Sequence, residues 1–225
     1  ELARKNAHVF VASRSIERGD AAVESIKEEI NNANVEYLPL DLQSLKSVKK
    51  AAEFFLDRKL PLHIFKGHYY APTCGIDFEN LNNPNAYSPL ERYCQSKLAN
   101  ILFSLELNKR LSDKEVYVNS VHPGIVNTEL LRGVEENYGF WVKPLTRSVS
   151  NIFFTSPENG ALTQLYCATS PEIVEKNLRG LYFVPYAKLE EPSEKSKDEE
   201  LARKLWEYSE NFIDERLKKI NEEDN

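Results

Sequence analysis

Two side chains four residues apart carry the clearest chemical signal in this sequence. Tyr93 and Lys97 fall within residues 90–111, whose apolar residues recur at helical spacing. Side chains at i and i+4 share one face of a helix, so the phenol and the ammonium are within mutual reach. A nearby ammonium favours the phenolate, which lets a phenol exchange a proton with a substrate oxygen. The spacing is also that of an ordinary helix face with an exposed lysine, and on spacing alone that second interpretation is favoured.

The rest of the sequence supplies elements that could position such a pair. Apolar, largely β-branched runs predict strands, and segments with helical spacing alternate with them. We expect strands at residues 7–13, 35–40, 60–64, 116–121 and 181–186, and helices at 17–32, 44–56, 90–111 and 156–169. Such alternation is typical of an α/β fold with a mainly parallel sheet.

The C-terminal part differs in composition. Residues 188–225 hold 13 acidic and 8 basic residues, so they supply −5 of the net charge of −6. We expect residues 1–187 to form a catalytic domain and residues 188–225 an acidic helical extension, with a mobile linker over residues 190–200. A rough apolar stripe predicts a solvated helix docked by one face, and a partner-binding helix is the alternative.

Composition excludes several classes of protein. The chain has 225 residues, with 29 Lys+Arg against 35 Asp+Glu, and lacks the basic footprint of a nucleic-acid binder. No run of 18 apolar residues exists, so no transmembrane span is expected. Three scattered cysteines without a CxxC pair suit a reducing, cytoplasmic compartment, and Cys94 is interpreted as a packing residue. The four histidines lack ligand spacing, and no metal site is expected.

Several segments together resemble the short-chain dehydrogenase/reductase family, specifically its retinol-dehydrogenase-like branch with many fungal members. The matching segments are AHVFVASRS at 7–15, LPLDL at 38–42, YCQSKLANILF at 93–103, VNSVHPGIVNT at 118–128, GLYFVP at 180–185 and KLW at 204–206. The resemblance implies a Rossmann-like, doubly wound parallel sheet flanked by helices. It also implies NAD(P)-dependent interconversion of alcohols with aldehydes or ketones.

The resemblance assigns catalytic roles to the helical pair. Tyr93 would be the general acid in reduction and the general base in oxidation. Lys97 would lower the pKa of that phenol and hold the nicotinamide ribose hydroxyls. The backbone of Pro123, Gly124 and Ile125 and the hydroxyl of Thr128 would contact the carboxamide side of the nicotinamide.

The choice between NAD and NADP depends on the loop that follows the strand expected at residues 7–13. Ser13 and Arg14 stand where an acidic residue would select NAD, and a guanidinium there accommodates the 2′-phosphate of NADP. We therefore predict NADP(H), with a surface arginine as the alternative interpretation. Asp41 and Leu42 match the family position beside the adenine; the alternative is a helix N-terminal aspartate with a core leucine.

The sequence departs from the family in decisive places. No G-x-x-x-G-x-G turn occurs, although only glycine lets backbone approach the pyrophosphate. The Asn-Asn-Ala-Gly segment, the helix with the catalytic Asn and the catalytic Ser are absent around residues 60–68. We expect the fold to lack the first strand-turn-helix, which would lie before Glu1, and a central segment. Segments omitted from a longer native chain are preferred over a natural truncation.

The leading hypothesis is an NADP(H)-dependent oxidoreductase that interconverts an apolar alcohol with its aldehyde or ketone, with a role in lipid metabolism. The alternatives are a non-catalytic dehydrogenase-like binding or scaffold protein and a nucleotide-sensing regulator. Residues 127–156 are rich in large apolar side chains and predict a substrate lid. The same residues could dock on a lipid surface, peripheral to the ER or lipid droplets, and the helix at 90–111 could support a homodimer.

Overall fold

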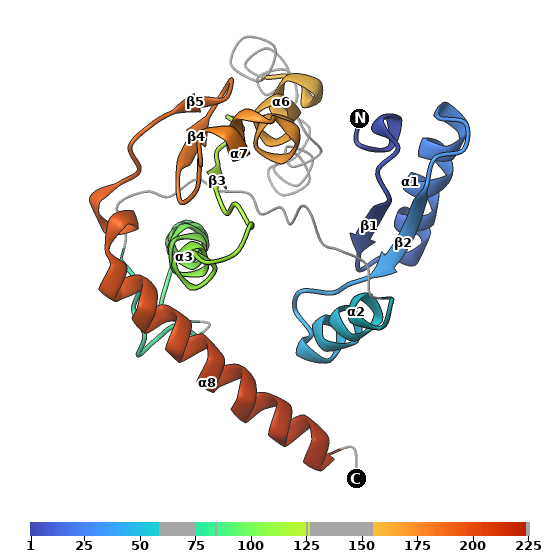
Figure 1. Ribbon diagram of the computed structural model, residues 1–225. Coiled ribbons are helices and arrows are strands. Elements are labelled where there is room, and N and C mark those ends of the chain that lie inside the picture. The colour runs from blue at the N-terminus through green and yellow to red at the C-terminus, as the bar shows by residue number, and fades with distance from the viewer. Residues whose placement is uncertain (59–74, 84, 125, 127–154, 224–225) are drawn as a thin grey trace, which may run out of the picture. The chain divides into compact units, whose positions relative to one another are not determined.

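The computed structural model describes residues 1–58, 75–83, 85–124, 126 and 155–223 (Figure 1). The chain divides into two compact units. The first is formed by Glu1–Leu62 with Ser209–Asn225, and the second by His63–Tyr208.

The first unit contains a strand–helix–strand arrangement followed by a second helix. It comprises the 3-10 helix η1 (Ala3–Lys5), β1 (Val9–Ser13), α1 (Ile16–Glu29), β2 (Val35–Pro39) and α2 (Leu45–Asp57). β1 and β2 pair in parallel, with Val9 opposite Val35 and Ser13 opposite Pro39. Because α1 connects two neighbouring parallel strands, this is the βαβ arrangement that the alternating pattern predicted.

Close packing of α1 on the strands depends on one glycine. Gly19 is buried, and a Cβ at this position would lie 2.1 Å from Cε2 of Tyr37 on β2. The absence of that Cβ lets the Tyr37 ring lie against the helix, and its hydroxyl donates a hydrogen bond to the Ser13 carbonyl at 2.8 Å. Val23 of α1 and Val35 of β2 are buried in the same cluster.

The second unit contains the longest predicted helix and a small sheet. Its elements are α3 (Pro89–Arg110), β3 (Ser120–Val121), α6 (Pro157–Thr169), α7 (Glu172–Glu175), β4 (Tyr182–Val184), β5 (Lys188–Leu189), the 3-10 helix η3 (Glu194–Lys197) and the first part of α8 (Glu199–Glu223). β3 and β4 are parallel, and β5 pairs with β4 in the antiparallel sense. The described strands thus confirm an α/β fold with mainly parallel pairing.

The core of the second unit joins α3 to α8. Leu98 and Leu102 of α3 are fully buried against Ala202 and Leu205 of α8. The first two residues of the apolar stripe predicted in the acidic C-terminal segment, Leu201 and Leu205, therefore pack on the helix that carries Tyr93. The division into a domain at residues 1–187 and an extension at 188–225 stays a prediction.

Three expectations about elements need correction. The strand predicted at residues 116–121 is limited to Ser120–Val121, and before it the Asn119 side chain makes two hydrogen bonds beside the one from the Gly180 N–H to the Val118 carbonyl. The Asn119 amide donates to the Leu178 carbonyl at 2.8 Å and accepts from the Leu181 N–H at 3.0 Å.

β5 was not predicted. Residues 190–200, expected to be a mobile linker, include η3 and the buried Ser196. The strand predicted at 60–64 lies outside the described residues.

Candidate active site

The helix that carries Tyr93 and Lys97 has a strong N-terminal start signal. Ser88 is the N-cap of α3, its hydroxyl accepts the Glu91 N–H at 3.3 Å, and the Glu91 carboxylate accepts the Ser88 N–H at 2.8 Å. Pro89 follows at the first helical position, where its missing N–H costs nothing. This capping box sets the start of α3 and hence the face on which Tyr93 lies.

Tyr93 and Lys97 lie together on that face. The Lys97 ammonium is 5.1 Å from the centroid of the Tyr93 ring, within the range of a cation–π contact. Tyr93 is 44% exposed, whereas Lys97 is partly buried. Burial lowers the pKa of Lys97 from its ordinary value. The pair therefore presents an accessible phenol beside a partly desolvated amine.

A hydrogen-bonded network fixes the segment before α3 to the helix. The Asp77 N–H donates to Gln95 Oε1 at 3.1 Å, and the Tyr87 hydroxyl donates to the Asp77 carboxylate. The hydrogen bond to Asp77 raises the pKa of Tyr87, and the same bond, more than those from Asn80, lowers the pKa of Asp77. We call Asp77, Tyr87 and Gln95 the N-terminal clamp of α3.

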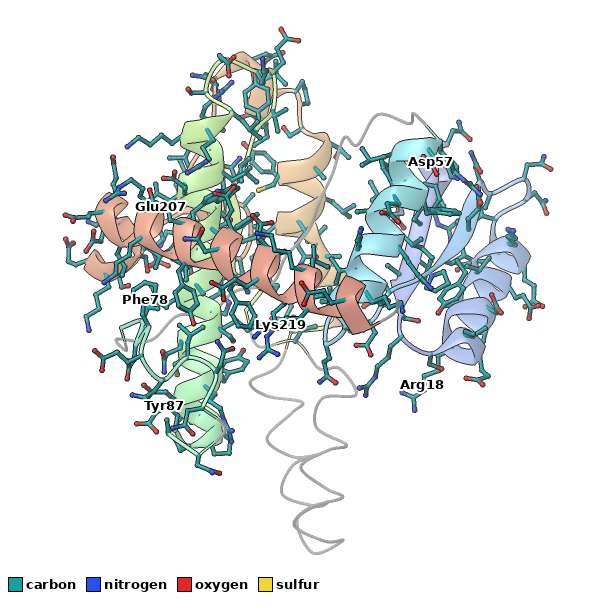
Figure 2. The ribbon with its side chains drawn as sticks, turned by 90° about the horizontal axis from the view of Figure 1, so that it is seen from below. Arg18, Asp57, Phe78, Tyr87, Glu207 and Lys219 are labelled. Atoms are coloured by element: carbon teal, nitrogen blue, oxygen red, sulfur yellow. The ribbon has the colours of Figure 1, made fainter. Side chains whose placement is uncertain are left out.

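The same segment is tied to α8. The Phe78 ring lies 5.4 Å from the Tyr208 ring, and the Lys204 ammonium lies 4.6 Å above Phe78. Asn82 donates a hydrogen bond to the Tyr208 hydroxyl at 3.1 Å. In Figure 2, Phe78 and Tyr87 lie along the first half of α3. The segment before α3 thus contacts both α3, through Asp77, and α8, through Phe78 and Asn82. Sequence reasoning missed the clamp, although the Ser-x-x-Glu signature at 88–91 marked the helix start that it supports.

In the first unit, the loop between β1 and α1 carries Ser13 and Arg14. The Ser13 hydroxyl donates to the Ser15 carbonyl at 2.9 Å, and Ser15 caps α1. Arg14 is exposed, and no ion pair joins it to any described residue. The Ser15 hydroxyl donates to Glu17 at 3.0 Å, so a carboxylate is held at the same loop. The sequence shows Glu17 as the first carboxylate after Arg14, but its hydrogen bond to Ser15 was not foreseen.

Asp41 and Leu42 lie at the same edge of the β1–β2 pair as Arg14, because each segment follows the carboxyl end of its strand. The Leu40 N–H donates to the Ser13 carbonyl at 3.0 Å and connects the two loops. Asp41 accepts the Gln43 N–H at 2.9 Å. Leu42 is 80% exposed, so the interpretation of it as a core leucine is wrong.

In the second unit, the Pro-Gly segment follows β3. Pro123 is fully buried, and Gly124 has a φ of +81°, a conformation that favours glycine. A Cβ at Gly124 would also lie 3.1 Å from Cγ of Pro185. Ile125 and Thr128 lie outside the described residues, as do residues 127–154 of the predicted lid.

The cysteines and acidic groups of the described residues offer no second reactive centre. Cys94 is buried inside α3, in agreement with a packing role. Burial raises the pKa of the Cys167 thiol to about 11, so this thiol stays protonated at neutral pH. Within the described ranges, no group of His, Cys, Asp and Glu side chains could hold a metal ion.

Comparison with known proteins gives a consistent set of relatives. No protein-family model matches the chain. It is 32% identical over 247 residues to an oxidoreductase from Schizosaccharomyces pombe, covering 83% of this chain and 72% of that protein. It is 32% identical over 260 residues to dehydrogenase/reductase SDR family member 13 from Bos taurus, covering 93% of this chain and 67% of that protein. It is 46% identical over 138 residues to human retinol dehydrogenase 14, covering 61% of this chain and 40% of that protein.

The lengths of these alignments are informative. Those of 247 and 260 residues exceed the 225 residues of the chain. Each of these two relatives therefore contains residues within the aligned region that have no counterpart here. This agrees with the expectation that a segment of the family fold is absent from this sequence.

Solved structures support the same fold. A protein from Mycobacterium paratuberculosis has a TM-score of 0.62 and 24% identity, covering 95% of this chain and 86% of that chain. L-sorbose reductase from Gluconobacter frateurii, solved with NADPH and L-sorbose, has a TM-score of 0.59 and 16% identity, covering 85% of this chain and 90% of that chain. Across the described part of the chain, none of the helices combines the length and apolar character needed to cross a bilayer.

Proposed function

Because the chain belongs to the short-chain dehydrogenase/reductase family, in its retinol-dehydrogenase-like branch, we propose that it is an NADP(H)-dependent oxidoreductase of apolar alcohols and carbonyl compounds. The observation that carries the proposal is the Tyr93–Lys97 pair on α3. The phenol is accessible, and the ammonium lies 5.1 Å from its ring.

Tyr93 and Lys97 together carry out the proton transfer of the reaction. When a carbonyl is reduced, the Tyr93 hydroxyl gives its proton to the carbonyl oxygen. When an alcohol is oxidised, the phenolate takes that proton back. The Lys97 ammonium favours the phenolate by charge. The same ammonium would hold the ribose hydroxyls of a bound cofactor. NADP(H) supplies or accepts the hydride.

The residues at the edge of the β1–β2 pair fit an NADP-type cofactor. Arg14 is exposed and has no ion-pair partner among the described residues, so its guanidinium is available to bind a phosphate group. Ser13 shares that loop, and Asp41 with the exposed Leu42 lies beside it. The NADPH bound to L-sorbose reductase, which has the same fold, supports this choice. Pro123, Gly124, Ile125 and Thr128 would hold the nicotinamide end.

A second candidate function is supported by family motifs that the sequence lacks. The sequence contains no G-x-x-x-G-x-G turn, and Ile64-Phe65-Lys66 precedes Gly67-His68 where the family has its catalytic serine. A chain without these groups would act as a non-catalytic dehydrogenase-like binding or scaffold protein. Cofactor binding without turnover is the result that separates this function from the first.

The finer predictions about partners belong to the same proposal. The apolar residues within 127–156 support an apolar substrate, a role in lipid metabolism and a peripheral contact with the ER or lipid droplets. A homodimer would have to use faces of α3 other than the one with Leu98 and Leu102, since these residues pack against α8.

The test compares NADPH consumption with decanal and with acetaldehyde. We expect the purified protein to reduce decanal faster, and Tyr93→Phe to lower that rate by about 10²–10⁴-fold, since the variant keeps the ring but loses its proton. Tyr186→Phe is the matched control, because Tyr186 is also an exposed tyrosine (59%) but lies outside α3.

Three results would count against parts of the proposal. Unchanged turnover in Tyr93→Phe would remove Tyr93 from the mechanism. Equal rates with the two aldehydes would overturn the apolar substrate. NADPH binding measured by fluorescence, with no turnover of either aldehyde, would establish the scaffold function instead.

A further inference from the structure

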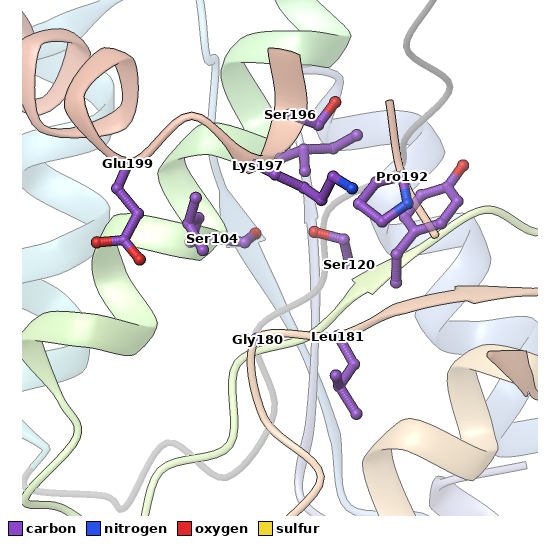
Figure 3. Close-up of a pocket in the computed structure, with 11 residues that line it drawn as sticks. Ser104, Ser120, Gly180, Leu181, Pro192, Ser196, Lys197 and Glu199 are labelled. Atoms are coloured by element: carbon purple, nitrogen blue, oxygen red, sulfur yellow. The ribbon is translucent and has the colours of Figure 1, made fainter. Parts of the chain in front are cut away.

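A small pocket lies along α3, about one to two helical turns beyond Lys97. Its volume is about 250 Å³. α3 contributes Ile101, Ser104 and Leu105, β3 contributes Ser120, and the remaining walls come from Gly180–Tyr182 and from residues between 192 and 199. All of these residues belong to the second unit. Figure 3 shows the hydroxyls of Ser104 and Ser120 turned toward each other across this space.

The two hydroxyls differ in what they can offer. Both residues are buried, at 6% and 4% exposure. Ser104 donates its one proton to the Asn100 carbonyl at 3.1 Å, so its oxygen can only accept a further hydrogen bond. The Ser120 hydroxyl makes none of the hydrogen bonds found among the described residues, so it can still donate. The pocket therefore presents an acceptor facing a donor.

The charged groups at the pocket are already paired. The Lys197 ammonium contacts Glu194 at 2.7 Å and Glu191 at 3.4 Å, and Glu199 contacts Lys109 at 2.9 Å. Of the charged residues in these pairs only Lys197 and Glu199 line the pocket; their charges are opposite, and each is already engaged in an ion pair. The aliphatic side chains of Ile101, Leu105 and Leu181 supply an apolar wall. The lining thus favours a neutral molecule with one polar group and a hydrocarbon body.

We propose that this pocket is a second, non-catalytic binding site for a small neutral alcohol. An alcohol hydroxyl donates to Ser104 and accepts from Ser120, while its carbon skeleton lies on the aliphatic wall. A ketone oxygen has no proton and cannot satisfy Ser104, so the pocket discriminates an alcohol from the corresponding carbonyl compound.

Cyclopentanol and cyclopentanone are matched probes, because they share a five-membered ring and differ in the hydroxyl proton. Binding is measured by ligand-observed NMR on the full chain without cofactor. We expect a dissociation constant on the order of millimolar for cyclopentanol, as befits so small a ligand. Cyclopentanone should bind about three- to tenfold more weakly, the value of one neutral hydrogen bond.

The variants separate the roles of the two serines. Ser104→Ala removes the acceptor, so cyclopentanol should fall to the affinity of cyclopentanone while cyclopentanone is unchanged. Ser120→Ala removes the donor and should weaken both probes. Ser96→Ala is the matched control, because Ser96 is an exposed serine of α3 whose hydroxyl donates to a helix carbonyl at 2.7 Å, yet it does not line the pocket.

Each remaining outcome contradicts the proposal. Absence of saturable binding would mean that the pocket holds only water, and equal affinity of the wild-type protein for the two probes would mean that the pocket does not distinguish an alcohol from a ketone. Neither result depends on whether a variant folds. Retained preference for cyclopentanol in Ser104→Ala would place the probe elsewhere. Loss of that preference in Tyr93→Phe would place it at the catalytic pair. Because no cofactor or turnover is involved, failure here leaves the proposed oxidoreductase function untouched.

Discussion

The guanidinium of Arg14 lies in the loop before α1, and the first turn of α1 carries a negative charge that would oppose the proposed cofactor. Glu17 accepts a hydrogen bond from Ser15 at 3.0 Å, and its backbone N–H, followed by that hydroxyl, holds the pKa of Glu17 below its ordinary value. The carboxylate is therefore ionised at neutral pH. A 2′-phosphate arriving at Arg14 meets attraction from one side chain and repulsion from the other.

Two variants measure these opposing effects. Arg14→Ala should erase most of a roughly ten- to hundredfold preference for NADPH over NADH, because one charge-assisted hydrogen bond is lost. Glu17→Gln should tighten NADPH by roughly two- to fivefold and leave NADH nearly unchanged, since the charge is exposed and screened. Titration of both cofactors by fluorescence checks the two variants. Equal changes in the affinities for NADPH and NADH in either variant would show that the loop does not distinguish the two cofactors by the 2′-phosphate.

The sequence was enough to predict which residues form the site, but not the contacts that surround them. Tyr93 and Lys97 face each other as the i, i+4 spacing predicted, because helix geometry is local. The exposure of Leu42 and the hydrogen bond from Ser15 to Glu17 could not be predicted. Both depend on how the β1–β2 edge is built from segments that are far apart in the sequence.

At the scale of elements, the clamp before α3 has a pH dependence of defined sign. Tyr87 donates to Asp77 only while it is protonated, and this bond raises the pKa of Tyr87 above its ordinary value near 10. The stabilisation is complete below pH 10 and is lost as the pH rises through the raised value. The pKa of Asp77 is lowered, so the Asp77 carboxylate contributes to stability at neutral pH. That contribution is lost only in acid, as the pH falls through the lowered pKa.

Thermal unfolding across the alkaline range tests the clamp. Tyr87→Phe should unfold at a lower temperature than the wild type at pH 7, and the difference should shrink towards zero above about pH 10. Tyr186→Phe, an exposed tyrosine outside the clamp, should show no such convergence. A constant difference between Tyr87→Phe and the wild type at every pH would mean that the ring, and not its proton, supports the segment.

The sequence predicted four helix starts and the strands β1, β2 and β4 closely, whereas it missed β5 and the limits of β3. Ser15, Ser44, Ser88 and Ser156 each cap a helix close to its predicted start, because a cap needs only the next three residues. β5 pairs with β4 through residues that show no alternating pattern, and β3 begins only after Asn119. The limits of β3 and β5 depend on partners distant in sequence, and no local signal reports them.

At the scale of the whole molecule, the alignments with relatives point to a missing internal segment. Two of them run longer than the chain itself. Removal of central strands from a parallel sheet would leave buried N–H and C=O groups without partners, which a stable protein rarely tolerates. We therefore expect the native protein to be larger than the 25.9 kDa of this sequence. Intact mass spectrometry of protein isolated from its source checks this, and a mass of 25.9 kDa would contradict it.

The Asn119 side chain that precedes β3 also bears on the chemical ageing of the protein. An asparagine followed by serine deamidates when the next backbone nitrogen attacks the side-chain amide. Here the Ser120 N–H is held by the Leu181 carbonyl at 2.9 Å, and both ends of the Asn119 amide are engaged. The folded chain keeps the nucleophile and its target in separate hydrogen bonds. Conversion of Asn119 to aspartate would then proceed through molecules that have opened locally, and its accumulation during storage would record how often this part of the sheet comes apart.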